Sequence, residues 1–330
     1  MELTLLSNVG LLAAGIVLLV FSGDYLVKGS VAIAHRFKIS SLVIGLTVVA
    51  FGTSAPELIV SLDAALTGHP EIALGNVIGS NVANIALVLG LTVAILPMPV
   101  SEQTIKRSWP IMLISGAVLF ISMIDGKVTR GEGILMFIML LMFIVSSIKS
   151  SKRFPPKVKV PQIGNKHRTW VYFVMVILAA AGLAGGSRLL VTGASAIAAV
   201  AGISERVISI TIVAFGTSLP ELTASVVAAF KKETDISVGN IIGSNIFNVF
   251  AVIGITAGVK PIFFSFSEFS IDLWFMLAVY ILLFIFMLPF KSIFKTALSL
   301  KNIQGGIIMR AAGIILFVLY LGYMVVLFKT

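Results

Sequence analysis

Oxygen-bearing side chains interrupt an otherwise apolar part of this chain at GTSAPE, residues 52–57. Thr53 and Ser54 lie four and three residues before Glu57, a spacing that places the three side chains on one face of a helix. Carboxylate and hydroxyl oxygens bind hard cations such as Ca²⁺ and Na⁺, whereas zinc and copper favour imidazole or sulfur ligands, which this set lacks. The pattern therefore predicts a site for a hard cation.

The same pattern occurs a second time at a constant distance along the chain. VVAFGTSAPEL at 48–58 recurs as IVAFGTSLPEL at 212–222, and LGNVIGSNVANIALVLG at 74–90 recurs as VGNIIGSNIFNVFAVIG at 238–254. Both pairs are 164 positions apart, with no insertion or deletion between them, which indicates an internal duplication. The additional oxygen-bearing side chains are Thr217, Ser218 and Glu221, together with Ser80 and Asn84 and their repeats Ser244 and Asn248.

A proline follows the hydroxyl residues in both copies. Because Pro56 and Pro220 lack an N–H, the carbonyls of Gly52 and Gly216 lose their helical partners and are predicted to be free to bind. A glutamate inside a membrane costs about 3 kcal/mol on insertion scales, so its presence usually indicates function. The structural alternative is a protonated glutamate bonded to a neighbouring helix, but duplication of the whole oxygen set favours a cation site.

The composition is that of an integral membrane protein. Of 330 residues, 58% are hydrophobic and 12% are charged, with a mean hydropathy of +1.09, whereas soluble domains have about 25% charged residues. No cysteine is present, which excludes disulfides and thiolate metal sites. No dinucleotide fingerprint follows the glycines at 182–186, so no cofactor is expected, and without an HExxH sequence a hydrolase is a weak alternative.

Apolar runs of about 20 residues, long enough to cross a bilayer as helices, recur along the chain. We predict an all-α integral membrane protein with ten transmembrane helices in two inverted five-helix repeats. The motif begins on the second and again on the seventh predicted span, so an odd number of crossings inverts the second copy, as is typical of secondary transporters. The predicted spans are 5–26, 41–66, 72–97, 108–124, 132–148, 169–198, 206–230, 236–258, 270–289 and 306–327.

Basic residues concentrate in alternate predicted loops, and this asymmetry indicates orientation in the cell membrane. The net charge of +10 reflects this positive-inside pattern and does not indicate a nucleic-acid partner. Both termini are predicted to be extracellular, and the basic segment 149–168 to be a cytoplasmic linker between a first repeat at 1–148 and a second at 169–330. The basic loop residues include Lys28, Arg36, Lys38, Lys106, Arg107, Lys231 and Lys232, whereas Asp125 and Glu132 accompany basic residues on the opposite side.

Other repeated polar residues are predicted to have structural roles. Four asparagines are expected to hold backbone geometry or to bridge helices, and ion contact is a minority option for them. Asp24 and Arg188 occupy equivalent positions under the 164-residue offset and are considered as an ion pair, the alternative being that each lies at a wet helix end. The asparagines are Asn76, Asn81, Asn240 and Asn245.

The repeated motifs, GTSAPE with GNVIGSN and GTSLPE with GNIIGSN, resemble the alpha repeats of the Ca²⁺/cation antiporter superfamily, and most of all the prokaryotic sodium/calcium exchangers. The resemblance implies a fold of two inverted halves, with the first and sixth spans sliding past a core. By position it also implies that Glu57 and Glu221 bind Ca²⁺ and Na⁺. The further ligands that it implies are the side chains of Thr53, Thr217, Ser54, Ser218, Ser80 and Ser244 and the backbone oxygens of Ala50 and Ala214.

Two differences from relatives bear on the coupling ion. Proton-coupled relatives tend to have a GNAAE-like sequence, which is absent here, and an aspartate of some relatives and of the potassium-dependent branch is Asn248 in this chain. We therefore predict Na⁺/Ca²⁺ antiport in the lipid bilayer, with no cofactor and no obligate protein partner. Antiport of protons, or of another divalent cation, is the nearest alternative, followed by a cation channel lined by the same carboxylates.

Overall fold

A computed structural model describes residues 2–153, 168–202, 214–288 and 305–327. Within these ranges nine helices are long and apolar enough to cross a membrane, and the shorter apolar helix Leu219–Phe230 accompanies them. The predicted all-α membrane fold is therefore confirmed. The predicted span 206–230 begins outside the described residues, so a count of ten helices and their inverted relation stay predictions.

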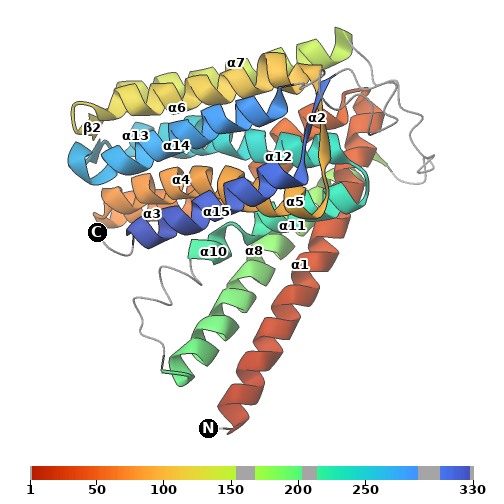
Figure 1. Cartoon of the computed structure of the whole chain (residues 1–330), viewed down its shortest axis with the longest axis vertical. Coiled ribbons are helices and arrows are strands. Elements are labelled where there is room, and N and C mark those ends of the chain that lie inside the picture. Colours follow the sequence, from red (N-terminus) through yellow and green to blue (C-terminus); the bar gives the residue numbers. More distant parts are fainter. Residues whose placement is uncertain (1, 154–167, 203–213, 289–304, 328–330) are drawn as a thin grey trace.

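The first half of the chain contains helices interrupted by wider, π-helical turns (η) and two short strands (Figure 1). Its elements are α1 (Glu2–Phe37), α2 (Ser41–Ile44), η1 (Gly45–Val49), α3 (Ala50–Thr67), α4 (Pro70–Val82), η2 (Ala83–Leu89), α5 (Gly90–Ile95), β1 (Met98–Ser101), η3 (Thr104–Ser108), α6 (Trp109–Met123), β2 (Lys127–Val128) and α7 (Arg130–Arg153).

The second half has the same kinds of elements. They are α8 (Thr169–Val200), α10 (Ala214–Thr217), α11 (Leu219–Phe230), α12 (Thr234–Phe247), η5 (Asn248–Ile253), α13 (Gly254–Val259), β3 (Ile262–Phe263), α14 (Phe266–Met287), β4 (Gly305–Ile308) and α15 (Arg310–Leu327).

Helices α1 and α8 lie side by side along their length and extend beyond the rest of the bundle (Figure 1). Glycines allow this close approach: a Cβ atom on Gly15 would lie only 2.8 Å from the carbonyl oxygen of Gly186. Helix α1 has 36 residues and is longer than the predicted span 5–26, so Lys28 and Arg36 lie on a helix and not in a loop as predicted. The C-terminal turns of α1 contain charged residues. The apolar run that defines a predicted span therefore ends before the helix does.

The α1–α8 pair contacts the bundle through its own apolar cluster. Buried residues of α1 and α8 pack there with residues of η1 and α11, whereas a second and larger cluster joins α4, α6, α7, α12, α14 and α15. At the edge of the first cluster Asp24 of α1 pairs with Lys231 after α11 and, at 2.7 Å, with Lys28. The pairing of Asp24 with Arg188 that the offset suggested is therefore wrong, because Lys28 and Lys231, the residue that follows α11, pair with the carboxylate instead.

Two helix crossings in the bundle have the same close backbone contact. A Cβ atom on Gly90 would lie 3.1 Å from the carbonyl oxygen of Gly313, and one on Gly254 would lie 3.1 Å from that of Gly133. These contacts join α5 to α15 and α13 to α7, and the strand pairs β1–β4 and β2–β3 accompany them. Elements from the two halves of the chain are thus interleaved at both crossings.

At the close α5–α15 crossing, one added side chain is expected to lower the stability of the fold substantially. In Gly313→Val the new Cβ would lie 2.6 Å from the Gly90 carbonyl oxygen, so the helices must separate. We expect the free energy of unfolding to fall by about 2–3 kcal/mol, the usual cost of overpacking. Thermal unfolding of the purified chain measures this, with Gly322→Val on the same helix as control because no atom lies within 4 Å of its Cβ position. Equal losses in both variants would contradict the close crossing.

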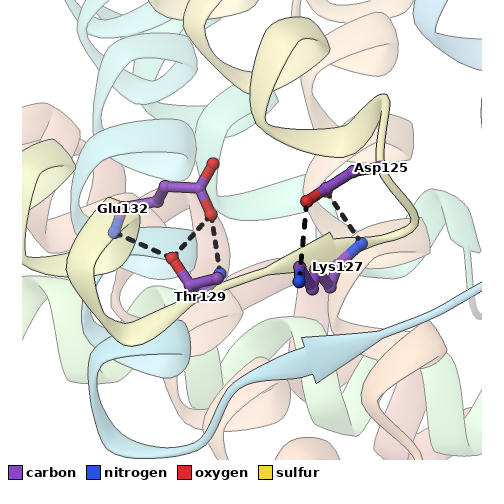
Figure 2. Close-up of polar contacts among 4 residues, drawn as sticks. All are labelled: Asp125, Lys127, Thr129 and Glu132. Atoms are coloured by element: carbon purple, nitrogen blue, oxygen red, sulfur yellow. Dashed lines mark hydrogen bonds and ion pairs between the residues drawn. The ribbon is translucent and has the colours of Figure 1, made fainter.

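The start of α7 is fixed by local polar contacts, shown in Figure 2. The Glu132 carboxylate accepts hydrogen bonds from the N–H and the hydroxyl of Thr129, at 2.8 and 2.7 Å, and the Glu132 N–H donates to the same hydroxyl. This is a capping box, which satisfies donors that a helix start leaves unpaired. Beside it Asp125 accepts from the N–H of Lys127 and lies 3.9 Å from its ammonium group.

Candidate cation-binding site

Two buried glutamates occupy the centre of the candidate site. Glu57 lies on α3 and is 2% exposed, and Glu221 lies in the first turn of α11 and is 1% exposed. Their carboxylates are close enough for their charges to interact, and the hydroxyls of Thr53 and Ser54 face the Glu221 carboxylate. Burying two like charges is costly without a compensating cation.

The carboxylate oxygens have unused capacity to accept hydrogen bonds or to coordinate. In the described part of the chain, Oε2 of Glu57 and both carboxylate oxygens of Glu221 are buried without a hydrogen-bond partner. The Ser54 hydroxyl is also buried without a hydrogen-bond partner among these residues. Within these ranges no group of three or more His, Cys, Asp or Glu side chains gathers. The side chains of Thr53 and Ser54 near the Glu221 carboxylate offer neutral hydroxyl oxygens. Such an all-oxygen set suits Na⁺ or Ca²⁺.

Thr53 connects the first copy of the motif to the second. Its hydroxyl lies 3.1 Å from Oδ1 of Asn240, 3.2 Å from the hydroxyl of Ser244 and 3.3 Å from the carbonyl oxygen of Ala50. Thr53 and Ser244 are both fully buried. Three sequence-predicted ligands, Thr53, Ser244 and the Ala50 carbonyl, therefore meet at one point.

An asparagine supports each glutamate in the same way. Asn76 donates to the carbonyl oxygen of Glu57 at 3.2 Å and to the Ser61 hydroxyl at 2.9 Å. The repeats of these residues are bonded alike, since Asn240 donates to the Glu221 carbonyl oxygen at 3.4 Å and to the Ser225 hydroxyl at 3.0 Å. The predicted structural role of these asparagines is confirmed. The two serines were missed by sequence reasoning, although Ser61 and Ser225 are also 164 positions apart.

The second motif carries its amides on π-helical turns. Asn84 lies in η2 and Asn248 begins η5; such wide turns are frequent at functional sites. Nδ2 of Asn248 donates to Oδ1 of Asn81 at 3.1 Å, which bridges two helices as predicted for Asn81. Oδ1 of Asn248 and both side-chain polar atoms of Asn84 are buried without a partner among the described residues. These amides, like the carboxylates, have free acceptor positions.

Helices that carry one copy of the motif pack against helices that carry the other copy. Helix α3, with Glu57, packs against α12 and η5, and α11, with Glu221, packs against η2. Ser80 is buried on α4, and Ser218 is buried just before α11. Thr217 at the end of α10 is only partly buried. Ala214 begins α10, and the preceding part of the predicted span lies outside the described residues.

The two proline-containing helices differ, although their sequences match. Pro56 lies inside the continuous helix α3, whereas a break at Ser218 separates α10 from α11 and puts Pro220 in the first turn of α11. The Gly216 carbonyl was predicted to be free, but it accepts a hydrogen bond from the Ser187 hydroxyl of α8. That prediction is wrong because a neighbouring helix supplies the donor that the proline removed.

Comparison with known proteins identifies the family. A sequence profile of the sodium/calcium exchanger protein family matches residues 7–149 and 171–329. The putative antiporter CaxA of Alkalimonas amylolytica is 37% identical over 321 residues, covering 96% of this chain and 97% of that protein. Sodium/calcium exchanger MaX1 of Methanosarcina acetivorans is 30% identical over 359 residues, covering 97% and 98%.

The fold agrees with these sequence matches. A solved structure of the sodium-calcium exchanger NCX_Mj, soaked with zero Na⁺ and Ca²⁺, superposes with a TM-score of 0.79 at 30% identity and covers 97% of this chain and 98% of its own. The chain belongs to the sodium/calcium exchanger protein family, which is a family of transporters and not of enzymes. The family resemblance predicted from the motifs is confirmed.

Proposed function

We propose that this protein exchanges Na⁺ for Ca²⁺ across a membrane at the buried site between α3 and α11. The observation that carries the proposal is the pair Glu57 and Glu221, which are buried, lie close enough for their charges to interact and have unused acceptor positions. Family membership supports it, as do solved NCX_Mj structures soaked with Na⁺ together with Ca²⁺ or Sr²⁺. The remaining proposed ligands are Thr53, Thr217, Ser54, Ser218, Ser80, Ser244, Asn84, Asn248 and the backbone oxygens of Ala50 and Ala214.

Charge balance explains why exchange is favoured over one-way flux. Two ionised glutamates repel each other in a medium of low dielectric constant, so a change between the two access states is energetically costly while the site is empty. One Ca²⁺ or two Na⁺ cancel the two negative charges, and a third Na⁺ leaves one positive charge. Because both loads use the same oxygens, they compete, and the site returns only after it has bound the other ion.

The proposed transport cycle is alternating access between two related states. Two inverted halves at 1–148 and 169–330 would supply two equivalent arrangements around a central site. The separate apolar cluster under α1 and α8 supports movement of this pair relative to the bundle. In the proposed orientation both termini are extracellular and the segment 149–168 is cytoplasmic.

Ca²⁺/H⁺ exchange is the second candidate function, because protons bind to the same two carboxylates. Uptake of radiolabelled Ca²⁺ into proteoliposomes that contain Na⁺, K⁺ or acidic buffer separates these functions. The proposal predicts uptake driven by an outward Na⁺ gradient and no uptake above symmetric controls with K⁺ or protons. Uptake driven only by the proton gradient would show that the coupling ion is the proton and not Na⁺. Uptake independent of every gradient would contradict exchange.

A further inference from the structure

A groove beside α7 combines apolar and basic residues at some distance from the candidate cation site. It has a volume of about 770 Å³ and is lined by residues of η3 and of the C-terminal half of α7. Leu141, Met142 and Val145 are 48%, 56% and 50% exposed and line one part of it. Arg107 and Lys149, both exposed, line the other part. Figure 1 shows α7 at the outer edge of the bundle.

The lining residues of α7 follow the period of a helix. Leu141, Val145 and Lys149 are four residues apart, and Met142, Ser146 and Ser150 form the adjacent row, so all six share one face. Eight residues of helix extend about 12 Å. The groove is therefore apolar within the predicted membrane span and becomes basic at the end of α7, where the predicted headgroup region begins.

The basic end of the groove has hydrogen-bond donors to spare. Arg107 donates to the Ser150 hydroxyl, which leaves most of the five donors of a guanidinium group unused. Neither Arg107 nor Lys149 has an acidic partner within the described ranges, although neighbouring Lys106 pairs with Glu102. Two cationic side chains that face one groove without a counter-ion are complementary to an anion, and Arg and phosphate oxygens form strong charge-assisted hydrogen bonds.

We propose that this groove binds an anionic phospholipid of the leaflet on the basic side of the protein. Its phosphate would lie between Arg107 and Lys149, and one acyl chain would lie along Leu141 and Val145. Basic pockets between membrane helices at this depth favour anionic headgroups. A soluble phosphate would use only the basic end, and a zwitterionic lipid has no net charge to neutralise the two cations. The proposal does not depend on the ion that the protein transports.

Native mass spectrometry of the purified, detergent-solubilised full chain tests the proposal with three probes. These are phosphatidylglycerol, phosphatidylcholine with the same acyl chains, and soluble glycerol 3-phosphate. We expect phosphatidylglycerol to bind at least about tenfold more tightly than phosphatidylcholine, since each basic residue near an anionic headgroup contributes to the free energy of binding. Glycerol 3-phosphate should bind much more weakly, because it gains no contact with the apolar residues.

Three variants separate the basic end from the apolar part. Lys149→Gln should remove most of the preference for phosphatidylglycerol, and Arg107→Gln with Lys149→Gln should remove all of it. Val145→Ser should weaken the binding of both lipids. The matched control is Lys127→Gln in β2 with Arg130→Gln at the start of α7, which should leave the preference unchanged. Wild-type preference in the Arg107 and Lys149 double variant, or glycerol 3-phosphate binding as tight as that of the lipid, would overturn the proposal.

Discussion

Replacing Glu221 with glutamine is expected to abolish Na⁺-driven Ca²⁺ uptake, and Glu57→Gln is expected to have the same effect. Each substitution removes one of the two buried charges that would compensate Ca²⁺ in the proposed site, and it leaves the side-chain volume nearly unchanged. A unit charge about 4 Å from another contributes about 4 kcal/mol at an effective dielectric constant of 20. The initial rate of uptake into proteoliposomes at subsaturating Ca²⁺ should therefore fall by at least about 100-fold.

Thermal unfolding of the same variants distinguishes loss of ion binding from loss of folding. Without ions, Glu57→Gln and Glu221→Gln should unfold at a higher temperature than the ion-free wild type, because the burial of two like charges is relieved. Added Ca²⁺ should stabilise the wild type and no longer stabilise the variants. Glu102→Gln, which changes an exposed glutamate paired with Lys106, should behave as wild type. Wild-type uptake by either central variant would contradict the assigned roles.

Asn240→Leu is expected to lower both stability and Ca²⁺ affinity. Its side-chain amide bonds the Glu221 carbonyl oxygen and the Ser225 hydroxyl, and its Oδ1 accepts from Thr53. Leucine leaves buried polar groups unpaired, at about 1–3 kcal/mol each, so the free energy of unfolding should fall by about 2–4 kcal/mol. Because Thr53 loses a partner that fixes its hydroxyl, Ca²⁺ affinity should fall about tenfold.

Asn76→Leu is the matched comparison, because Asn76 makes the equivalent bonds to Glu57 and Ser61. It should lower stability less, since Asn76 is only partly buried and makes two bonds where Asn240 makes three. It should also change Ca²⁺ affinity less, since Asn76 is not bonded to Thr53. Unfolding transitions and Ca²⁺ titration of the two purified variants check this. If both variants lose the same affinity, the bond between Thr53 and Asn240 has no special role in positioning the site.

The residues of the candidate site could be predicted because duplication makes them stand out. Glu57 and Glu221 are unusual in apolar spans, and the constant offset identifies the accompanying hydroxyls and amides without any knowledge of the fold. The same offset contains Ser61 and Ser225, which were overlooked because single serines are common in membrane helices. Their role becomes visible only when Asn76 and Asn240 are seen to bond them.

Other features depend on contacts between distant segments and could not be predicted from the repeat. The two motif copies have the same proline, yet α3 is continuous whereas a break at Ser218 precedes α11. The Gly216 carbonyl is satisfied by Ser187 of α8, and Asp24 is paired with Lys231. The partners of Gly216 and Asp24 come from other segments of the chain, and local sequence cannot show which side chains a neighbouring segment will present.

The most direct test of a shared site is equilibrium binding of radiolabelled Ca²⁺ to the purified chain at rising Na⁺ concentrations. If both ions use the oxygens around Glu57 and Glu221, Na⁺ should raise the apparent Kd for Ca²⁺ without changing the number of Ca²⁺ ions bound at saturation. The rise should be steeper than first order in Na⁺, because more than one Na⁺ replaces each Ca²⁺. A Ca²⁺ affinity that does not change with Na⁺ would contradict exchange through one site.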